Sequence, residues 1–148
     1  MAWQGDAFER NLVGDFPLWG VFGHDQQSYL GRTYIALVRE GDVDPVVGTT
    51  PEEREQLHII KVGLHKVLAE LYHPDRLNYA TLGNEWPHLH EHVIPRYQTP
   101  REVDGVTFID HNWGKDYAPY DKGFQIPEAV FDKIKADLSA GIADSVKL

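Results

Sequence analysis

The feature that most constrains the fold is one long amphipathic helix, which the sequence predicts between Thr50 and Pro74. Thr50, Pro51 and Glu53 form a capping-box pattern with proline at the first helical position. Pro74 disfavours a helical residue at His73, so the helix ends there. The apolar residues of this segment recur at helical spacing and make one stripe: Leu57, Ile60, Leu64, Val67, Leu68 and Leu71. Such a stripe must be buried against another layer of structure.

Segments rich in β-branched and aromatic residues predict that this other layer is a sheet. Residues 33–38 and 18–22 are candidate strands before the helix. Residues 76–82 and 88–94 are candidate strands after it, and the short Gly- and Asn-containing connection 83–87 suits an antiparallel hairpin. We therefore expect an α+β fold with an antiparallel sheet of about five strands, packed against the central helix.

The last third of the chain predicts a strand or extended arm over residues 103–109 and a terminal helix over residues 127–138. Between them, residues 110–125 form an aromatic-containing loop that is too long to be a mere connection. We expect residues 112–115 and 117–120 to cover a pocket or to contact another subunit.

Three histidines, His88, His90 and His92, stand at alternate positions in the strand predicted after the 83–87 connection. In an extended strand their side chains point to one face, about 6.6 to 7 Å apart. Imidazole has an ordinary pKa of about 6.5, so it can attack, accept protons and donate protons near neutral pH. The row of histidines predicts phosphate chemistry.

Charge and composition limit the partners of such a site. The 148 residues carry a formal net charge of −9 and no basic stripe, which argues against binding a nucleic-acid polymer but permits a small anionic ligand. The chain has no cysteine, so it offers neither a disulfide nor a catalytic thiol. No run approaches the roughly 20 apolar residues of a membrane-spanning helix, and the amino end lacks a basic region followed by an apolar stretch. We expect a cytoplasmic protein that does not enter a membrane.

The run from His88 to Tyr97, His-Leu-His-Glu-His-Val-Ile-Pro-Arg-Tyr, resembles the signature of the histidine triad (HIT) superfamily of nucleotide hydrolases and transferases. The order of elements over residues 18–96 agrees with that family, and residues 97–148 match less specifically. The resemblance implies one HIT-like domain over residues 1–148. It also implies a two-step reaction at a nucleotide α-phosphate, in which His90 forms a nucleotidyl-histidine intermediate, His92 contacts the leaving oxygen and His88 orients the network.

The resemblance also assigns substrate contacts. Asn84, just before the triad strand, is expected beside the phosphate, and Asp25 is the favoured ribose contact. Arg32 stands where many family members have a further histidine, so this imidazole is missing from the pattern and Arg32 can supply phosphate charge instead. Glu91 is a second departure, because the family has an apolar residue there; it is expected on the face opposite the imidazoles, in solvent or against another chain. The neighbouring Arg96 is expected to pack or to form an ion pair rather than to touch ligand.

The substrate implied is a dinucleoside polyphosphate or a nucleoside phosphoramidate, and the usual family assembly is a homodimer. No cofactor or metal is required, although Mg²⁺ can accompany a polyphosphate. Two alternatives stay open: a nucleotide-binding module without turnover, and a metal-dependent hydrolase that uses two of the three histidines. The outer two histidines would lie about 13 Å apart along a strand, so a metal would need another ligand such as His111 or Glu85. His24 has no assigned role.

Overall fold

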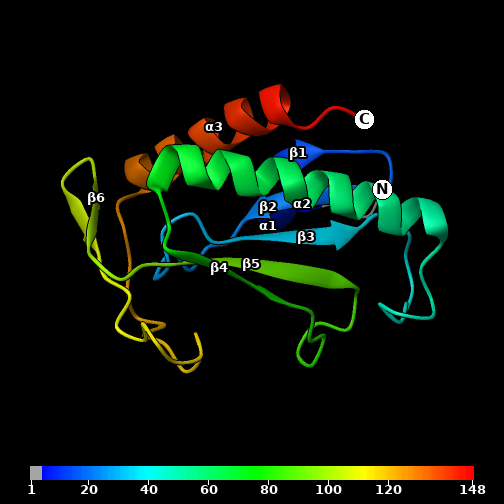
Figure 1. Ribbon diagram of the computed structural model, residues 1–148, viewed down its shortest axis with the longest axis horizontal. Coiled ribbons are helices and arrows are strands. Elements are labelled where there is room, and N and C mark those ends of the chain that lie inside the picture. The colour runs from blue at the N-terminus through cyan, green and yellow to red at the C-terminus, as the bar shows by residue number, and fades with distance from the viewer. Residues whose placement is uncertain (1–4) are drawn as a thin grey trace.

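The computed structural model describes residues 5–148, without the side chains of residues 6 and 7. Its centre is a five-stranded antiparallel sheet in the order β1-β2-β3-β5-β4 (Figure 1). The strands of this sheet are β1 (Leu12–Asp15), β2 (Trp19–Gly23), β3 (Thr33–Leu37), β4 (Arg76–Ala80) and β5 (His90–Arg96). The short helix α1 (Asp6–Glu9) precedes them, and β6 (Arg101–Val103) and β7 (Val106–Phe108) make a separate two-stranded hairpin. The predicted α+β fold with five antiparallel strands is confirmed.

Two long helices, α2 (Pro51–Tyr72) and α3 (Glu128–Ser145), lie side by side over one face of the sheet (Figure 1). The predicted capping box is present at the start of α2: the Thr50 hydroxyl accepts from the Glu53 N–H and the Glu53 carboxylate accepts from the Thr50 N–H. The helices approach closely at Gly63 and Gly141. A Cβ at Gly63 would lie 2.5 Å from the Val146 side chain, and one at Gly141 would lie 2.7 Å from that of Val67.

The two faces of the sheet have different neighbours. Ile35 and Val93 point toward the helices and belong to the main core, which draws residues from Val13 to Val146. Phe22 and Ala36 form a second buried cluster on the opposite face, together with Tyr34 and Trp86. Side chains alternate between faces along a strand, so His90 and His92 share this second face with Ala36 and Tyr34, their register partners in β3. The histidines therefore lie on the side of the sheet that the long helices leave uncovered.

Three predicted elements differ from the observed ones. The triad strand begins at His90 rather than at residue 88, because the chain bends at His88 directly after Pro87 and the ladder with β4 begins only at the Ala80–His92 pair. Residues 103–109 belong to the β6–β7 hairpin, whose turn places Asp104 at φ 46° and Gly105 at φ 81°. The terminal helix is longer than predicted and continues to Ser145. The structure adds α1 and β1, which no pattern indicated.

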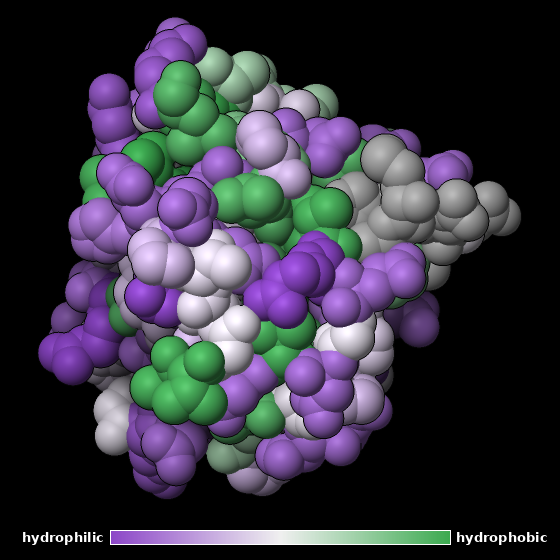
Figure 2. Space-filling model, turned by 90° about the vertical axis from the view of Figure 1, so that its right-hand side faces the viewer, coloured by the Kyte–Doolittle hydropathy of each residue, from purple (hydrophilic) through white to green (hydrophobic). Residues whose placement is uncertain are grey.

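Figure 2 views the end of the molecule that bears the connection before α2, where hydrophobic side chains are interspersed among hydrophilic ones. Val46 and Val47 in that connection are 76% and 85% exposed. Within residues 5–148, no helix combines the length and the apolar character that crossing a membrane requires.

Candidate active site

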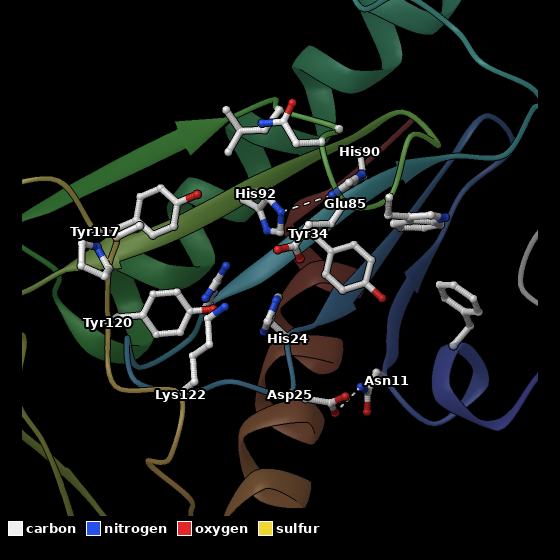
Figure 3. A pocket seen from close by; sticks show the side chains of 18 residues that line it. Asn11, His24, Asp25, Tyr34, Glu85, His90, His92, Tyr117, Tyr120 and Lys122 are labelled. Carbon is white, nitrogen blue, oxygen red and sulfur yellow. Dashed lines mark hydrogen bonds between the residues drawn. The ribbon is translucent and has the colours of Figure 1, made fainter.

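A cavity of about 900 Å³ opens on the sheet face opposite the long helices. This volume is within the usual range for small-molecule sites. Its lining draws on the sheet, the 81–89 connection and the loop after β7: Phe8, Asn11, His24, Asp25, Arg32, Tyr34, Leu82, Gly83, Asn84, Glu85, Trp86, His90, His92, Tyr117, Ala118, Pro119, Tyr120 and Lys122. Figure 3 shows Tyr117 and Tyr120 on one side of His92, and His90 and Tyr34 on its other side.

His90 is held with one ring nitrogen facing its own backbone and the other facing the cavity. Its Nδ1 lies 2.7 Å from the carbonyl oxygen of His88. A carbonyl only accepts hydrogen bonds, so Nδ1 carries the proton and Nε2 of the neutral ring keeps its lone pair. The ring is buried at 7% exposure, which fixes its direction. The geometry thus presents an unprotonated nitrogen at the cavity, as a nucleophile requires.

His92 lies beside His90, with Nε2 of the two rings 3.2 Å apart (Figure 3). Burial, then the charge of Arg32, then His90 lower the pKa of His92 from 6.5 to about 4. His92 is therefore neutral near pH 7, and its Nε2–H donates to the lone pair of His90. Its Nδ1 is buried and has no hydrogen-bond partner among the described residues. Near pH 7, His92 can therefore donate a hydrogen bond in the site through Nε2–H, but it is not a protonated imidazolium.

His88 does not join the other two histidines in the cavity. It precedes β5, its ring stacks on Trp86 at 5.1 Å between centroids, and its Nε2 bonds to the carbonyl oxygen of Leu37. The expected row of three evenly spaced imidazoles is wrong, because the bend after Pro87 turns His88 away from the strand. What His88 contributes to the site is its backbone carbonyl, which orients His90.

A fourth imidazole that no pattern indicated comes from the connection between β2 and β3. His24 and Arg32 are joined by a backbone bond from the His24 N–H to the Arg32 carbonyl, one step beyond the Gly23–Thr33 pair of the ladder. The His24 ring lies 5.7 Å from that of His92, and its Nδ1 accepts from the Gln26 N–H, so Nε2 carries the proton. Burial, then Arg32, then the two neighbouring histidines lower the pKa of His24 to about 3. The sequence did offer one signal for this approach of His24: a histidine stands at the start of the connection between the two strands, and Gly31 and Arg32 stand at its end.

Arg32 is a buried cation on the lining of the cavity. Its side chain is buried at 3% exposure, and Nε and Nη1 have no hydrogen-bond partner in the described chain. Its guanidinium lies over the rings of Tyr120 and Tyr117, 4.9 and 5.6 Å from their centroids. Gly31 precedes it at φ 84°, and a Cβ there would meet Leu68 and Tyr72 at 3.0 Å, so the tight turn into β3 requires glycine.

The two other residues expected to contact substrate both line the cavity. Asn84 lies in the bend after Gly83, which has φ 72°. Asp25 accepts from Asn11 Nδ2 at 2.7 Å, an arrangement that fixes its carboxylate at the cavity edge (Figure 3).

Aromatic rings form the wall around Tyr34. The Tyr34 ring stacks on Phe22 at 5.0 Å and meets Trp86 edge to face at 6.3 Å, while Phe8 lies 5.4 Å from Trp86. Burial, assisted by the charge of Asp25, raises the pKa of Tyr34 to about 12, so its hydroxyl remains protonated. This aromatic side of the cavity suits a flat apolar group such as a nucleobase.

Part of the loop of residues 110–125 forms the opposite wall. The expected segment 117–120 lines the cavity, whereas residues 112–115 are not among the residues that line it. Its start is anchored by Arg96, whose guanidinium binds the Asp110 carboxylate at 2.7 and 3.2 Å, as the expected ion pair. Asn112 Nδ2 donates to the carbonyls of Tyr117 and Pro119 at 3.2 and 2.8 Å. These bonds hold the tyrosines of the loop against the sheet.

Glu91 points toward the helices, as alternation predicts, and not into solvent. Its carboxylate pairs with Lys61 of α2 at 2.8 Å, and the Lys61 ammonium also lies 4.8 Å from the ring centroid of Tyr79. The ion pair explains how a charged residue is accommodated at this position. In residues 5–148 no three or more His, Cys, Asp or Glu side chains are grouped so as to hold a metal ion, and neither His111 nor Glu85 completes such a set.

A family model described as the HIT domain matches residues 9–99, more than half of the chain. No curated protein matches it. Among solved structures, a histidine triad protein from Bradyrhizobium japonicum has a TM-score of 0.74 at 21% identity, covering 96% of this chain and 99% of that one. A histidine triad protein from Marinobacter aquaeolei VT8 has a TM-score of 0.69 at 21% identity, with coverages of 98% and 99%. A hypothetical histidine triad nucleotide-binding protein from Sulfolobus tokodaii strain7 has a TM-score of 0.68 at 11% identity, with coverages of 94% and 90%. At these identities the structural neighbours establish the fold.

Proposed function

Because the chain belongs to the HIT domain family, we propose that it is a nucleotide hydrolase or nucleotidyl transferase in which His90 attacks a nucleotide α-phosphate. The observation that carries the proposal is the bond from His90 Nδ1–H to the His88 carbonyl, which leaves the Nε2 lone pair facing the cavity. The substrate class is a dinucleoside polyphosphate or a nucleoside phosphoramidate.

The reaction divides one displacement into two. In the first step the Nε2 lone pair of His90 attacks phosphorus, and the bond to the leaving atom breaks with its electron pair. A bridging oxygen departs as a phosphate anion, whereas the nitrogen of a phosphoramidate takes up a proton from solvent and departs as the amine. Nδ1–H of the resulting imidazolium continues to donate to the His88 carbonyl. In the second step water, or another acceptor, attacks phosphorus and the pair of the P–N bond returns to Nε2. When water is the acceptor, one of its protons is released to solvent.

The cavity offers a place for each part of a nucleotide. The base fits the aromatic side with Tyr34, Trp86 and Phe8, and Asp25 can accept from the ribose hydroxyls. Asn84 and Arg32 bind the phosphates. The Nε2–H of His92, which bonds to His90 in the absence of ligand, turns to the leaving atom once a nucleotide is bound. The proposal includes a homodimer, a cytoplasmic location and no required cofactor, with Mg²⁺ accompanying a polyphosphate only as part of the substrate.

The test combines turnover with intact-mass measurement. The protein is incubated with adenine and guanine dinucleoside polyphosphates and nucleoside phosphoramidates, and the intact mass of the protein in quenched samples is measured by mass spectrometry. We expect a nucleotidyl adduct in the native protein and none in His90→Ala, with turnover reduced by about 10³-fold or more. His65→Ala is the matched control, because His65 is exposed on α2 and does not line the cavity.

The alternatives give different results. Binding of these nucleotides without adduct or turnover would favour a binding module. Activity that is lost with a chelator and restored by zinc would favour the metal-dependent hydrolase and contradict the role of His90.

A further inference from the structure

One imidazole of the cavity has no part in the two displacements proposed above. His24 stands in the connection between β2 and β3 and lines the cavity beside Asp25 and Arg32. Its ring is partly buried, and only one of its two nitrogens has a hydrogen-bond partner among the described residues. Polar side chains inside a protein are usually fully paired, so the second nitrogen is available to a ligand.

The proton of His24 is assigned by its contact with the backbone. Nδ1 accepts a hydrogen bond from the Gln26 N–H at 2.9 Å, so the proton of the neutral ring is on Nε2. The ring is neutral near pH 7, because burial and then the charge of Arg32 lower the pKa of His24 to about 3. Nε2 is unpaired without being one of the fully enclosed unpaired atoms, so its N–H is open to the cavity. His24 therefore presents a neutral donor.

The turn that carries His24 fixes the direction of this donor. The His24 N–H donates to the Arg32 carbonyl at 3.0 Å. The side-chain amide of Gln27, which is 1% exposed, donates to the carbonyls of both residues, at 2.7 Å for His24 and 2.9 Å for Arg32. The His24 ring also meets the Tyr34 ring edge to face at 6.0 Å. The connection is thus held at both ends, and the donor is in place before a ligand binds.

The groups nearest to this donor belong to the proposed reaction. The rings of His24 and His92 lie 5.7 Å apart, and Figure 3 shows them next to each other. They are not hydrogen-bonded, because His92 Nε2 bonds to His90 and His92 Nδ1 has no partner in the described chain. Arg32 is close enough to lower the pKa of both imidazoles, and its Nε and Nη1 are also unpaired. Two side chains therefore bring donors to one part of the cavity without acceptors for them among the described residues.

Phosphate oxygens fit these donors. Unpaired buried donors are costly, and an anion with several oxygens can accept from more than one of them. In the proposed attack phosphorus lies at His90 Nε2, and the ring of His90 is 4.8 Å from that of His92. A phosphate in that position can turn one non-bridging oxygen to His24 and another to Arg32.

We infer that His24 is a catalytic residue that donates its Nε2–H to a non-bridging oxygen of the α-phosphate, while Arg32 holds another oxygen of the same group. This role rests on the proposed attack by His90 and adds a donor that stabilises the charge on those oxygens. His24 keeps its proton throughout: the P–N bond to His90 forms, the bond to the leaving atom breaks, and the hydrogen bond from His24 strengthens. The same donor acts in the second displacement, in which the P–N bond breaks.

Two amide side chains separate the roles of the two nitrogens of His24. The amide of glutamine reaches about as far as Nε2, whereas that of asparagine reaches only as far as Nδ1. His24→Gln therefore keeps a donor in the cavity and gives up the acceptor for the Gln26 N–H. His24→Asn keeps that acceptor and gives up the donor.

The experiment measures kcat and KM with diadenosine tetraphosphate for both variants. His24→Asn should lower kcat by about 10²-fold, the lower end of the range for loss of one such donor, whereas His24→Gln should stay within about tenfold of the native protein. His65→Asn is the matched control, because His65 is exposed on α2 and does not line the cavity. If His24 only holds the turn at Gln26, the order is reversed and His24→Asn is the more active variant.

Sulfur substitution tests which atoms His24 touches. In the two diastereomers of an α-phosphorothioate analogue of the substrate, sulfur, a weak acceptor, replaces one or the other non-bridging oxygen. The ratio of their kcat/KM values should change by about fivefold or more between the native protein and His24→Asn, and should remain the same in His65→Asn. An unchanged ratio in His24→Asn would mean that the imidazole does not touch these oxygens.

A measurement on the native protein does not depend on how the variants fold. In an NMR spectrum of the histidine ring nitrogens, adenosine 5′-monophosphate should shift the Nε2 resonance of His24, because its phosphate accepts the hydrogen bond. Adenosine, which lacks the phosphate, should shift this resonance much less.

His24 does not have this role if His24→Asn matches or exceeds His24→Gln in activity while both remain folded by thermal melting. An Nε2 resonance of His24 that the monophosphate leaves unshifted would exclude the role as well. These results would still leave a nucleotidyl adduct on His90 of the native protein. Absence of that adduct with every substrate would instead overturn the proposed function.

Discussion

Arg32 and Arg96 are equally buried, each at 3% exposure, but they differ in their hydrogen bonds. Arg96 binds both oxygens of Asp110, the Asn78 side chain and the carbonyls of Asn112 and Lys115. Arg32 has two nitrogens without any partner in the described chain and faces the cavity. Both guanidinium groups lie over tyrosine rings, Arg96 over Tyr29 at 5.2 Å and Arg32 over Tyr120 at 4.9 Å.

The comparison teaches that burial alone does not tell a structural cation from a ligand-binding one. The satisfied guanidinium of Arg96 helps to hold the loop of residues 110–125 in place. Its removal would leave the buried Asp110 carboxylate without its charged partner. The unsatisfied guanidinium of Arg32 costs folding energy, and we propose that an anionic ligand supplies its missing acceptors. The following changes separate the two roles, beginning with the largest effect.

Replacing Arg96 should damage the fold. In Arg96→Met the Asp110 carboxylate, whose side chain is fully buried, loses its charged partner, and we expect the free energy of unfolding to fall by about 3 to 5 kcal/mol. Urea denaturation at pH 7 measures the change. Arg54→Met, at an exposed position of α2, is the control and should change stability by no more than about 0.5 kcal/mol. A loss below about 1 kcal/mol in Arg96→Met would show that the two arginines do not differ as described.

Asn112 links the region of Arg96 to the loop segment that carries Tyr117 and Tyr120. Its Nδ2 contacts the Tyr29 hydroxyl at 3.0 Å as well as the two loop carbonyls, so Asn112→Ala should cost about 2 to 3 kcal/mol. Amide hydrogen exchange should rise in residues 110–125 more than in the sheet. The exposed Asn84 provides the control variant Asn84→Ala, which should leave exchange in that loop unchanged. Equal protection of the amides of residues 110–125 in the two variants would mean that Asn112 does not hold this loop in place.

The charge of Arg32 should be visible in the pH dependence of stability. The folded-state pKa values of His24 and His92, about 3 and about 4, lie below the unfolded value of about 6.5, so between these limits the unfolded chain binds more protons. Stability is therefore fully present above pH 6.5 and is lost as the pH falls, by about 2 kcal/mol per imidazole down to pH 4.5.

Thermal melting across this pH range measures the effect, and His24→Gln should reduce it. Arg32→Met should reduce it as well, because Arg32 contributes to both pKa shifts, whereas Arg96→Met should not. An identical pH profile in Arg32→Met and the native protein would contradict the electrostatic coupling.

Arg32 should contribute the least to stability. We expect Arg32→Met to be neutral or to gain up to about 1 kcal/mol near pH 7, since an unpaired buried charge is replaced by an apolar chain of similar length. Adding inorganic phosphate should raise the melting temperature of the native protein more than that of this variant. A destabilisation as large as that of Arg96→Met would show that Arg32 has a structural role.

Much of the fold could be predicted because its signals are local. The capping box at Thr50 depends on neighbouring residues and lies where the sequence indicates. The predicted antiparallel pairing across the turn before His90 is present, although the connection spans residues 81–89 and not 83–87. The alternation of residues placed His90, His92 and Glu91 on their correct faces. The same rule failed at His88, because a bend after Pro87 interrupts the extended backbone that alternation assumes.

The rest of the site depends on contacts between distant residues. His24 reaches His92 only through the pairing of β2, β3 and β5, and Arg32 meets Tyr120 across 88 positions of sequence. The sequence could indicate that Arg32 replaces a histidine of the family pattern. It could not indicate that another imidazole approaches from the neighbouring connection, since no local pattern encodes the direction of a side chain in an irregular segment.

One side of the cavity, formed by Arg32, Tyr117, Tyr120 and Lys122, is built from two parts of the chain. Arg32 belongs to the segment that matches the HIT domain, residues 9–99, whereas Tyr117, Tyr120 and Lys122 lie beyond its end. His90 and the tyrosines that face it across the cavity therefore lie on separate stretches of chain. A change in the loop alone can therefore alter the surface that faces Arg32 while the bond between His90 Nδ1 and the His88 carbonyl stays intact.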